Sequence, residues 1–143
     1  YFLFDNIGGK MKRKELREAA VKLFYEMDIQ KTFEHKFYKN FLAENELIAL
    51  KDNYLKEVFD SFLLNRDNID DIIQKSSTSW DIKRIAKVDL SILRVAITEI
   101  LYLSDIPDKV SINEAIDLAK KYGDENSYKF VNGLLGKIVK NEN

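Results

Sequence analysis

The second half of the chain contains the stretch Asp89-Leu90-Ser91-Ile92-Leu93-Arg94-Val95-Ala96-Ile97-Thr98-Glu99-Ile100-Leu101, which decides the fold. Its apolar side chains cover more of a helical surface than a single stripe would. The pattern therefore predicts a central helix that is buried on most sides. Arg94 lies in the middle of this helix, and a buried guanidinium without a partner is strongly unfavourable. We expect Asp89, Glu99 or a group of carbonyl oxygens to lie beside it.

Helical periodicity extends from this stretch in both directions. Towards the N-terminus it predicts a first helix, a short one at about 37–42, a longer one at about 49–64 and a short piece around 69–73. Towards the C-terminus, two more helices are expected on either side of residue 123. The core stripes of the first and last helices are Leu16, Ala20, Leu23, Phe24 and Met27, and Val131, Leu134, Leu135 and Ile138.

Residues 76–79 are all serine or threonine and predict a loop that divides the chain. The fold class is all-α, with about seven helices in two packed halves at roughly 11–76 and 79–143 of one domain. The segment 1–10 is interpreted as an upstream extension or cloning remnant, because the chain begins without methionine and its first methionine is Met11.

Several helix ends carry capping signals. Ser111 and Glu114 have the spacing of a capping box, and Asp124 is placed to cap the last helix. Gly123 occupies the position of a left-handed C-cap. Thr78 or Ser79 is expected to cap a helix at 80–85.

Composition excludes several kinds of chemistry. The 143 residues include no cysteine, which rules out thiolate metal sites and cysteine nucleophiles, and only one histidine, His35. No glycine-rich phosphate loop, clustered metal ligands or apolar run long enough to cross a bilayer is present. We therefore expect a protein that is not an enzyme, uses no cofactor or metal, and does not enter a membrane.

Charge is uneven although the whole chain has a net charge of −1. The segment 10–22 carries six basic and two acidic residues. A run of this kind is either the solvated start of a helix or an arm that meets phosphates, and the pattern alone favours the solvated start. Arg13 and Arg17 are four residues apart and are expected to share a face.

The start of the last helix combines an aromatic ring with polar groups. Phe130 lies off the core stripe, and Lys129, Ser127 and Asn126 precede it. This combination suits an unpaired base stacked on the ring and its phosphate at a helix N-terminus. Packing of Phe130 into the core is an equally open interpretation. Tyr25, next to the core residue Phe24, is placed to present its ring outward.

Several motifs together resemble the NusB transcription antitermination family: the basic opening at 12–20, the stretch ILRVA at 92–96, SINEA at 111–115 and SYKFVNG at 127–133. The resemblance covers about residue 11 to the C-terminus. It implies a helical fold that binds the boxA element of ribosomal RNA transcripts together with NusE, a ribosomal protein, in the RNA polymerase elongation complex. The implied localisation is cytoplasmic.

The resemblance also implies roles for individual residues. Asp89 matches an acidic position near the junction of NusE and RNA. The positions that match RNA contacts are Arg13, Lys14, Arg17, Tyr25, Asn126, Ser127, Lys129, Phe130 and Asn132. The hypothesis requires the basic N-terminal side chains and Phe130 to converge on one exposed strip, with weak RNA binding by the chain alone.

Two alternatives come from other classes of protein. Related helical domains occur in rRNA cytosine methyltransferases, and this chain fits at most a detached accessory domain of that kind, since it lacks the cysteine nucleophile. The other alternative is a helical protein-interaction module that does not bind RNA.

Overall fold

Every regular element of the structure, a computed structural model that describes residues 11–79 and 81–142, is helical. The all-α prediction is confirmed, and six α-helices with one 3-10 helix come close to the seven expected. The expected extension at 1–10 lies outside the described residues. The elements are α1 (Arg13–Gln30), α2 (His35–Glu44), α3 (Tyr54–Ser76), the 3-10 helix η1 (Ile82–Arg84), α4 (Lys87–Tyr102), α5 (Asp108–Tyr122) and α6 (Ser127–Glu142).

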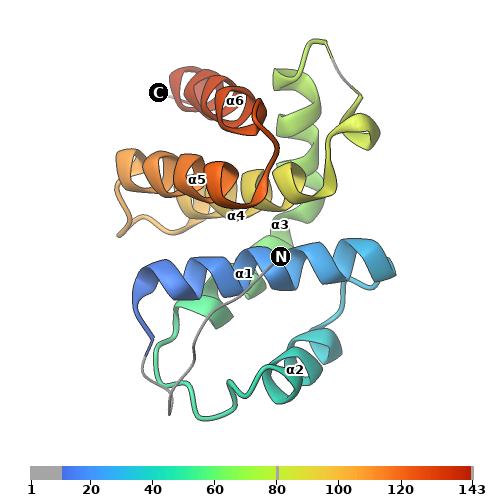
Figure 1. Ribbon diagram of the computed structural model, residues 1–143, viewed down its shortest axis with the longest axis vertical. Helices are drawn as coiled ribbons and strands as arrows, with labels where there is room; N and C mark the ends of the chain where they lie inside the picture. The colour runs from blue at the N-terminus through green and yellow to red at the C-terminus, as the bar shows by residue number, and fades with distance from the viewer. Residues whose placement is uncertain (1–10, 80, 143) are drawn as a thin grey trace.

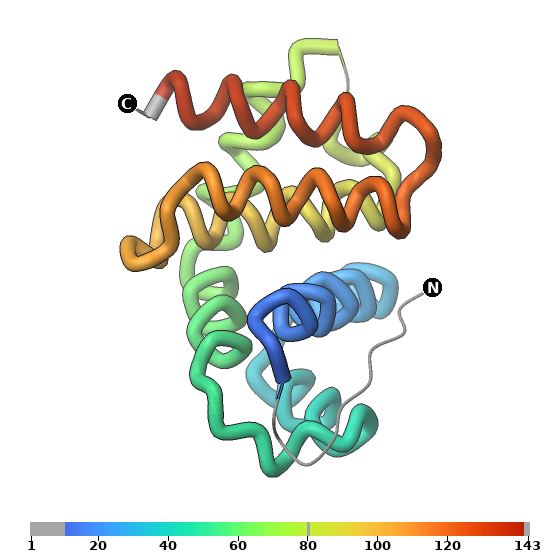
Figure 2. The backbone as a smooth tube through the Cα atoms, turned by 60° about the vertical axis from the view of Figure 1, so that its left-hand side comes forward, coloured from blue at the N-terminus to red at the C-terminus, as the bar shows by residue number. Residues whose placement is uncertain are grey.

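Helix α4 is the centre of the molecule and packs against α1, α3, α5 and α6 (Figure 1). Helix α2 lies beyond α1 at one end, and α6 lies beyond α5 at the other. Helix α3 runs across these layers and links the two ends (Figure 2). Every residue of α4 from 89 to 99 is buried, which confirms the prediction of burial on most sides.

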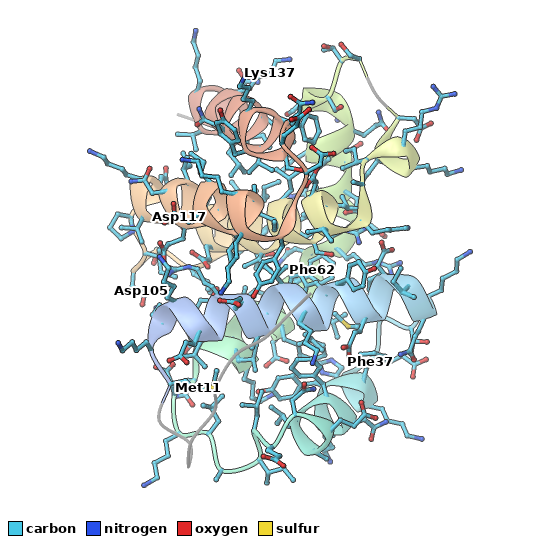
Figure 3. All side chains as sticks on the ribbon, viewed as in Figure 1. Met11, Phe37, Phe62, Asp105, Asp117 and Lys137 are labelled. Carbon is cyan, nitrogen blue, oxygen red and sulfur yellow. The ribbon has the colours of Figure 1, made fainter. Side chains whose placement is uncertain are left out.

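The predicted core stripes of the first and last helices are confirmed, since all nine of their residues are buried. The Phe24 and Phe62 rings stack with their centroids 4.3 Å apart where α1 meets α3. Phe62 lies between α1 and the helices above it in Figure 3.

The prediction of two separate helices at 49–64 and 69–73 is wrong. One helix, α3, begins at Tyr54 rather than at about residue 49, continues through 69–73 and is kinked at Asn65, whose φ is −115° and ψ is 15°. The Asn65 side-chain amide donates to the Ser61 carbonyl oxygen at 2.8 Å. An asparagine that bonds the backbone locally competes with the regular helical pattern, so the kink has a cause in the sequence.

Glu99 joins four helices at one buried point. From α4, its carboxylate accepts hydrogen bonds from Arg17 Nε of α1 at 2.8 Å and from the Ser111 hydroxyl of α5 at 2.7 Å. The Tyr54 hydroxyl of α3 is the third donor. The Glu99 side chain is 1% exposed, so these donors replace the water that the carboxylate loses on folding.

The expected partners of Arg94 are wrong. Arg94 forms a two-pronged pair with Asp70 of α3, at 2.9 and 2.8 Å, and lies 3.5 Å from a carboxylate oxygen of Asp28 in α1. Asp89 and Glu99 are each five residues from Arg94, and side chains with that spacing leave a helix in different directions.

Two capping predictions are also wrong. Helix α5 begins at Asp108, after Pro107, whose fixed φ and missing N–H suit that place. Ser111 therefore lies inside the helix, where its hydroxyl bonds Glu99 and cannot form a capping box. The element near 80–85 is the 3-10 helix η1, whose cap is Asp81 rather than Thr78 or Ser79.

Gly123 is needed for close approach and not for a left-handed turn. Its φ is −86°, which contradicts the predicted left-handed C-cap. A Cβ atom at this position would collide with the Ser127 Oγ and lie 2.7 Å from the Ala119 carbonyl oxygen. The glycine thus allows α6 to start directly against the end of α5.

The same substitution is expected to have opposite effects at two glycines. Gly123→Ala should lower the free energy of unfolding by about 1–3 kcal/mol, because its methyl group overpacks the α5–α6 turn. Gly136→Ala should raise it by about 1 kcal/mol, because a Cβ atom at Gly136 of α6 would meet nothing within 4 Å and alanine favours a helix. Urea unfolding followed by circular dichroism measures both, and equal effects of the two substitutions would contradict this assignment.

Candidate nucleic-acid interface

An open cleft of about 330 Å³ lies where the start of α4 meets the start of α6. Asp89 comes from the first turn of α4, and Asn126, Ser127 and Phe130 come from the α5–α6 turn and α6. The structure therefore brings together four of the residues that the sequence predicted. Arg84 of η1 lines the same cleft and was missed, although the basic pair at 83–84 just before the central helix could have indicated it.

The α5–α6 turn holds these groups by its own hydrogen bonds. The Asn126 backbone N–H donates to Asp124 Oδ1 at 2.8 Å, and the Asp124 N–H donates to the Ser127 Oγ at 3.0 Å. The sequence predicted Asp124 as the cap of the last helix, but α6 begins at Ser127, so Asp124 lies in the turn before the helix and its carboxylate bonds that turn. The Asn126 side chain remains exposed, and Phe130 is half-buried beside it.

Asp89 supplies a desolvated carboxyl group at the floor of the cleft. The residue is 7% exposed, and its Oδ1 has no hydrogen-bond partner among the described residues. Burial raises the pKa of Asp89, a hydrogen bond from Ser127 lowers it in part, and the negative charge of Asp124 adds to the rise. A buried acid that is only partly satisfied is unfavourable for stability, which is typical of a binding site.

Phe130 also forms a wall of a second cleft, on the side of α6 that faces the loop after α3. Lys129 lines this second cleft, and Asn132 is exposed further along α6. The ring of Phe130 is packed against the core and bounds open space on two sides. The sequence left two interpretations of Phe130 open, packing into the core and a ring that is available to a base. Each describes part of the environment of Phe130.

The basic start of α1 lies beside acidic side chains of the same chain. Lys14 Nζ is 3.4 Å from both Glu114 and Asp117 of α5, and the charge of Glu114 raises the pKa of Lys14. Arg13 is exposed and lies 3.9 Å from Asp52. Asp117 marks this part of α5 in Figure 3. An RNA phosphate at this end of α1 has to compete with these carboxylates.

The expectation that Arg17 and Phe130 share an exposed strip is wrong. Arg17 is 4% exposed, and its guanidinium bonds Glu99 and lies 3.6 Å from Glu114. Burial alone would lower the pKa of Arg17, but the hydrogen bond and charge of Glu99 raise it overall. Arg13 and Arg17 lie on the same side of α1, as expected. The packing of α4 and α5 covers Arg17 and leaves Arg13 exposed.

Tyr25 lies two turns beyond Glu18 on α1, and Glu18 contacts the end of α5. Glu18 of α1 accepts hydrogen bonds from Lys121 and Tyr122 at the end of α5. Because Lys14 pairs with the middle of α5 and Glu18 with its end, the two helices run in the same direction. Tyr25 is half-buried, and it follows Glu18 by seven residues, or two turns on one face.

Comparison with known proteins places the chain in a family. Residues 14–140 match the sequence profile of the NusB family. The transcription antitermination protein NusB of Alkaliphilus oremlandii is 46% identical over 132 residues, which cover 92% of this chain and 96% of that protein. The chain belongs to the NusB family.

Solved structures of NusB proteins have the same fold. The structure of T. maritima NusB is similar with a TM-score of 0.78 and 34% identity, over 92% of each chain. A chain from the crystal structure of antitermination factors NusB and NusE in complex with dsRNA is similar with a TM-score of 0.77 and 30% identity. That match covers 90% of this chain and 96% of the other.

No helix in the ranges 11–79 and 81–142 is long and apolar enough to cross a membrane. Within the same ranges, no three histidine, cysteine or acidic residues are grouped so that they could hold a metal ion.

The raised pKa of Asp89 predicts a pH-dependent effect of neutralising it. The folded state binds the Asp89 proton more tightly than the unfolded state, so ionisation of Asp89 reduces stability as pH rises through its raised pKa. Asp89→Asn should therefore raise the urea midpoint near pH 7, and the gain should shrink as the pH falls to about 4, where the native carboxyl is increasingly protonated. The exposed Asp105→Asn serves as the control and should change the midpoint little at either pH. A gain that is the same at both pH values would contradict this role of Asp89.

Proposed function

We propose that this chain is an RNA-binding transcription antitermination factor that binds boxA RNA together with NusE in the RNA polymerase elongation complex. It acts in the cytoplasm without catalysis. The observation that carries the proposal is the α4–α6 cleft, where Phe130, Asn126, Ser127 and Asp89 meet in a chain of the NusB family. A solved relative at 30% identity is described as NusB and NusE in complex with dsRNA.

The cleft has the chemistry of a site for an unpaired base. The half-buried Phe130 ring offers a surface for stacking, which is worth about 1–3 kcal/mol per base. The Asn126 amide can donate and accept hydrogen bonds at a base edge. Arg84 on the rim supplies a positive charge for the phosphate of the same nucleotide.

The charges explain why a partner is needed. The chain has a net charge of −1, and the basic start of α1 faces its own carboxylates. With about three or four phosphate contacts to single-stranded RNA, the logarithm of affinity should fall with the logarithm of salt concentration with a slope of about −2 to −3. Affinity from so few contacts is modest, so a partner that extends the RNA-binding surface is required.

The proposal predicts a strong effect of NusE. Labelled boxA RNA should bind the chain weakly alone and at least about tenfold more tightly when purified NusE is present, a gain of about 1.4 kcal/mol or more. A scrambled RNA of the same length is the control in a fluorescence anisotropy titration. Equal affinity with and without NusE, or equal affinity for the scrambled RNA, would contradict the proposal and favour an interaction module that does not bind RNA.

Phe130→Leu separates stacking from folding, because leucine preserves apolar packing but has no ring. It should weaken boxA binding in the presence of NusE by about fivefold or more, from the loss of stacking. Phe37→Leu in α2 is the matched control, since Phe37 is also a partly buried aromatic packed against the core. Phe37→Leu should leave RNA affinity unchanged, and equal losses for both variants would mean that Phe130 acts only through the fold.

A further inference from the structure

The second cleft beside Phe130 has a chemistry different from the first. Its volume is about 270 Å³, and it lies between the end of α3 and the outer face of α6. One wall is the hydroxyl-rich segment 76–79, and the opposite wall carries Lys129, Gly133 and Lys137. Lys137 is labelled on α6 in Figure 3.

The charges that line this cleft are all positive. Lys129 and Lys137 contribute two ammonium groups, and none of the described residues that line the cleft is acidic. The first cleft, in contrast, contains the carboxyl groups of Asp89 and Asp124. Ammonium groups and hydroxyl groups without a carboxylate are the donors that an oxyanion requires.

Two polar groups of the cleft have unused hydrogen-bonding capacity. Lys137 Nζ donates to the Ser76 carbonyl oxygen at 3.0 Å, which holds the ammonium group at the end of α3 and leaves its other N–H groups available. Ser77 is 6% exposed, and its hydroxyl has no hydrogen-bond partner among the described residues. Such a group is unfavourable in a folded protein unless it gains a partner.

Gly133 leaves a gap between the two lysines on the α6 side of the cleft. Lys129, Gly133 and Lys137 are four residues apart and lie on one face of the helix. A Cβ atom at Gly133 would meet nothing within 4 Å, so the chain itself does not require glycine at this position. The absent side chain lets a ligand approach the helix between the two ammonium groups.

We propose that the second cleft is a phosphate site, which binds a phosphodiester of the RNA strand whose base stacks on the other side of Phe130. The inference rests on the proposed function, because it assigns the cleft to the same RNA. The Phe130 ring separates the two clefts, so a base in the first and a backbone phosphate in the second belong to neighbouring positions of one strand. Lys129 and Lys137 bind the phosphate, and residues 76–79 offer hydroxyl donors.

Two glycine substitutions test the site without damage to the fold. Gly133→Ala and Gly136→Ala both replace a glycine of α6 whose Cβ would meet nothing within 4 Å, and both should raise the melting temperature by a few degrees. Only Gly133 lines the cleft. Gly133→Ala should weaken boxA binding in the presence of NusE by about tenfold, and Gly136→Ala should change it by less than about twofold. Equal affinity of the two variants would overturn the proposal.

Two lysine substitutions test the charge. Lys137→Gln should reduce the salt slope of RNA binding by about 0.7, the value for one phosphate contact to a single strand. Lys140→Gln removes an exposed lysine of the same helix outside the cleft and should leave the slope unchanged. An unchanged slope for Lys137→Gln would overturn the proposal.

Inorganic phosphate distinguishes the RNA backbone from a free anion. If phosphate raises the melting temperature over chloride of equal ionic strength, and Lys137→Gln removes this rise without any effect on RNA binding, the cleft binds a free anion and the proposal is overturned. If Phe130→Leu weakens RNA binding and Gly133→Ala and Lys137→Gln do not, the phosphate site fails and the proposed function stands. If the unmodified chain with NusE does not bind boxA RNA, both fail.

Discussion

The buried carboxylate of Glu99 is the interaction on which the arrangement of the helices depends. It lies on α4 and accepts hydrogen bonds from α1, α3 and α5, through Arg17, Tyr54 and Ser111. Burial and the neighbouring Glu99 charge raise the pKa of Tyr54 well above its ordinary value, so its hydroxyl stays protonated and continues to donate. Each of these donors is itself buried, and loss of the carboxylate would leave all three without their acceptor.

This constraint explains the distribution of the candidate interface. With Arg17 fixed to Glu99, α1 lies parallel to α5, and the contacts of Lys14 and Glu18 follow one another along α5. The α5–α6 turn follows the end of α5 that contacts Glu18. There it meets the first turn of α4, which contains Asp89. The basic start of α1 pairs with α5, whereas no residue of α1 lines either of the clefts beside Phe130.

The sequence predicted what depends on local periodicity and missed what depends on partners. The core stripe of α6, the burial of α4 and the grouping of Asn126, Ser127 and Phe130 follow from spacing within one or two turns. The partner of Arg94, the burial of Arg17 and the hydroxyl bond of Ser111 are set by the rotation of one helix against another, which periodicity does not specify. The sequence pattern suggests a left-handed turn at Gly123, whereas an atom of the next helix is what requires the glycine. The side-chain bond of Asn65 interrupts the helical pattern at the kink of α3. In the sequence, this interruption looks the same as a gap between two helices.

The central claim, that Arg17 acts through Glu99 and not on RNA, is tested by a double-mutant cycle of Arg17→Met and Glu99→Met with RNA affinity measured on the folded fraction. Each single change should lower the free energy of unfolding by about 3–5 kcal/mol, because it leaves the other charge buried alone. The double variant should recover part of this loss, with a coupling of about 2–3 kcal/mol. Folded Arg17→Met with NusE is predicted to bind boxA RNA as tightly as the unmodified chain. Full stability of Arg17→Met together with lost RNA binding would contradict the claim.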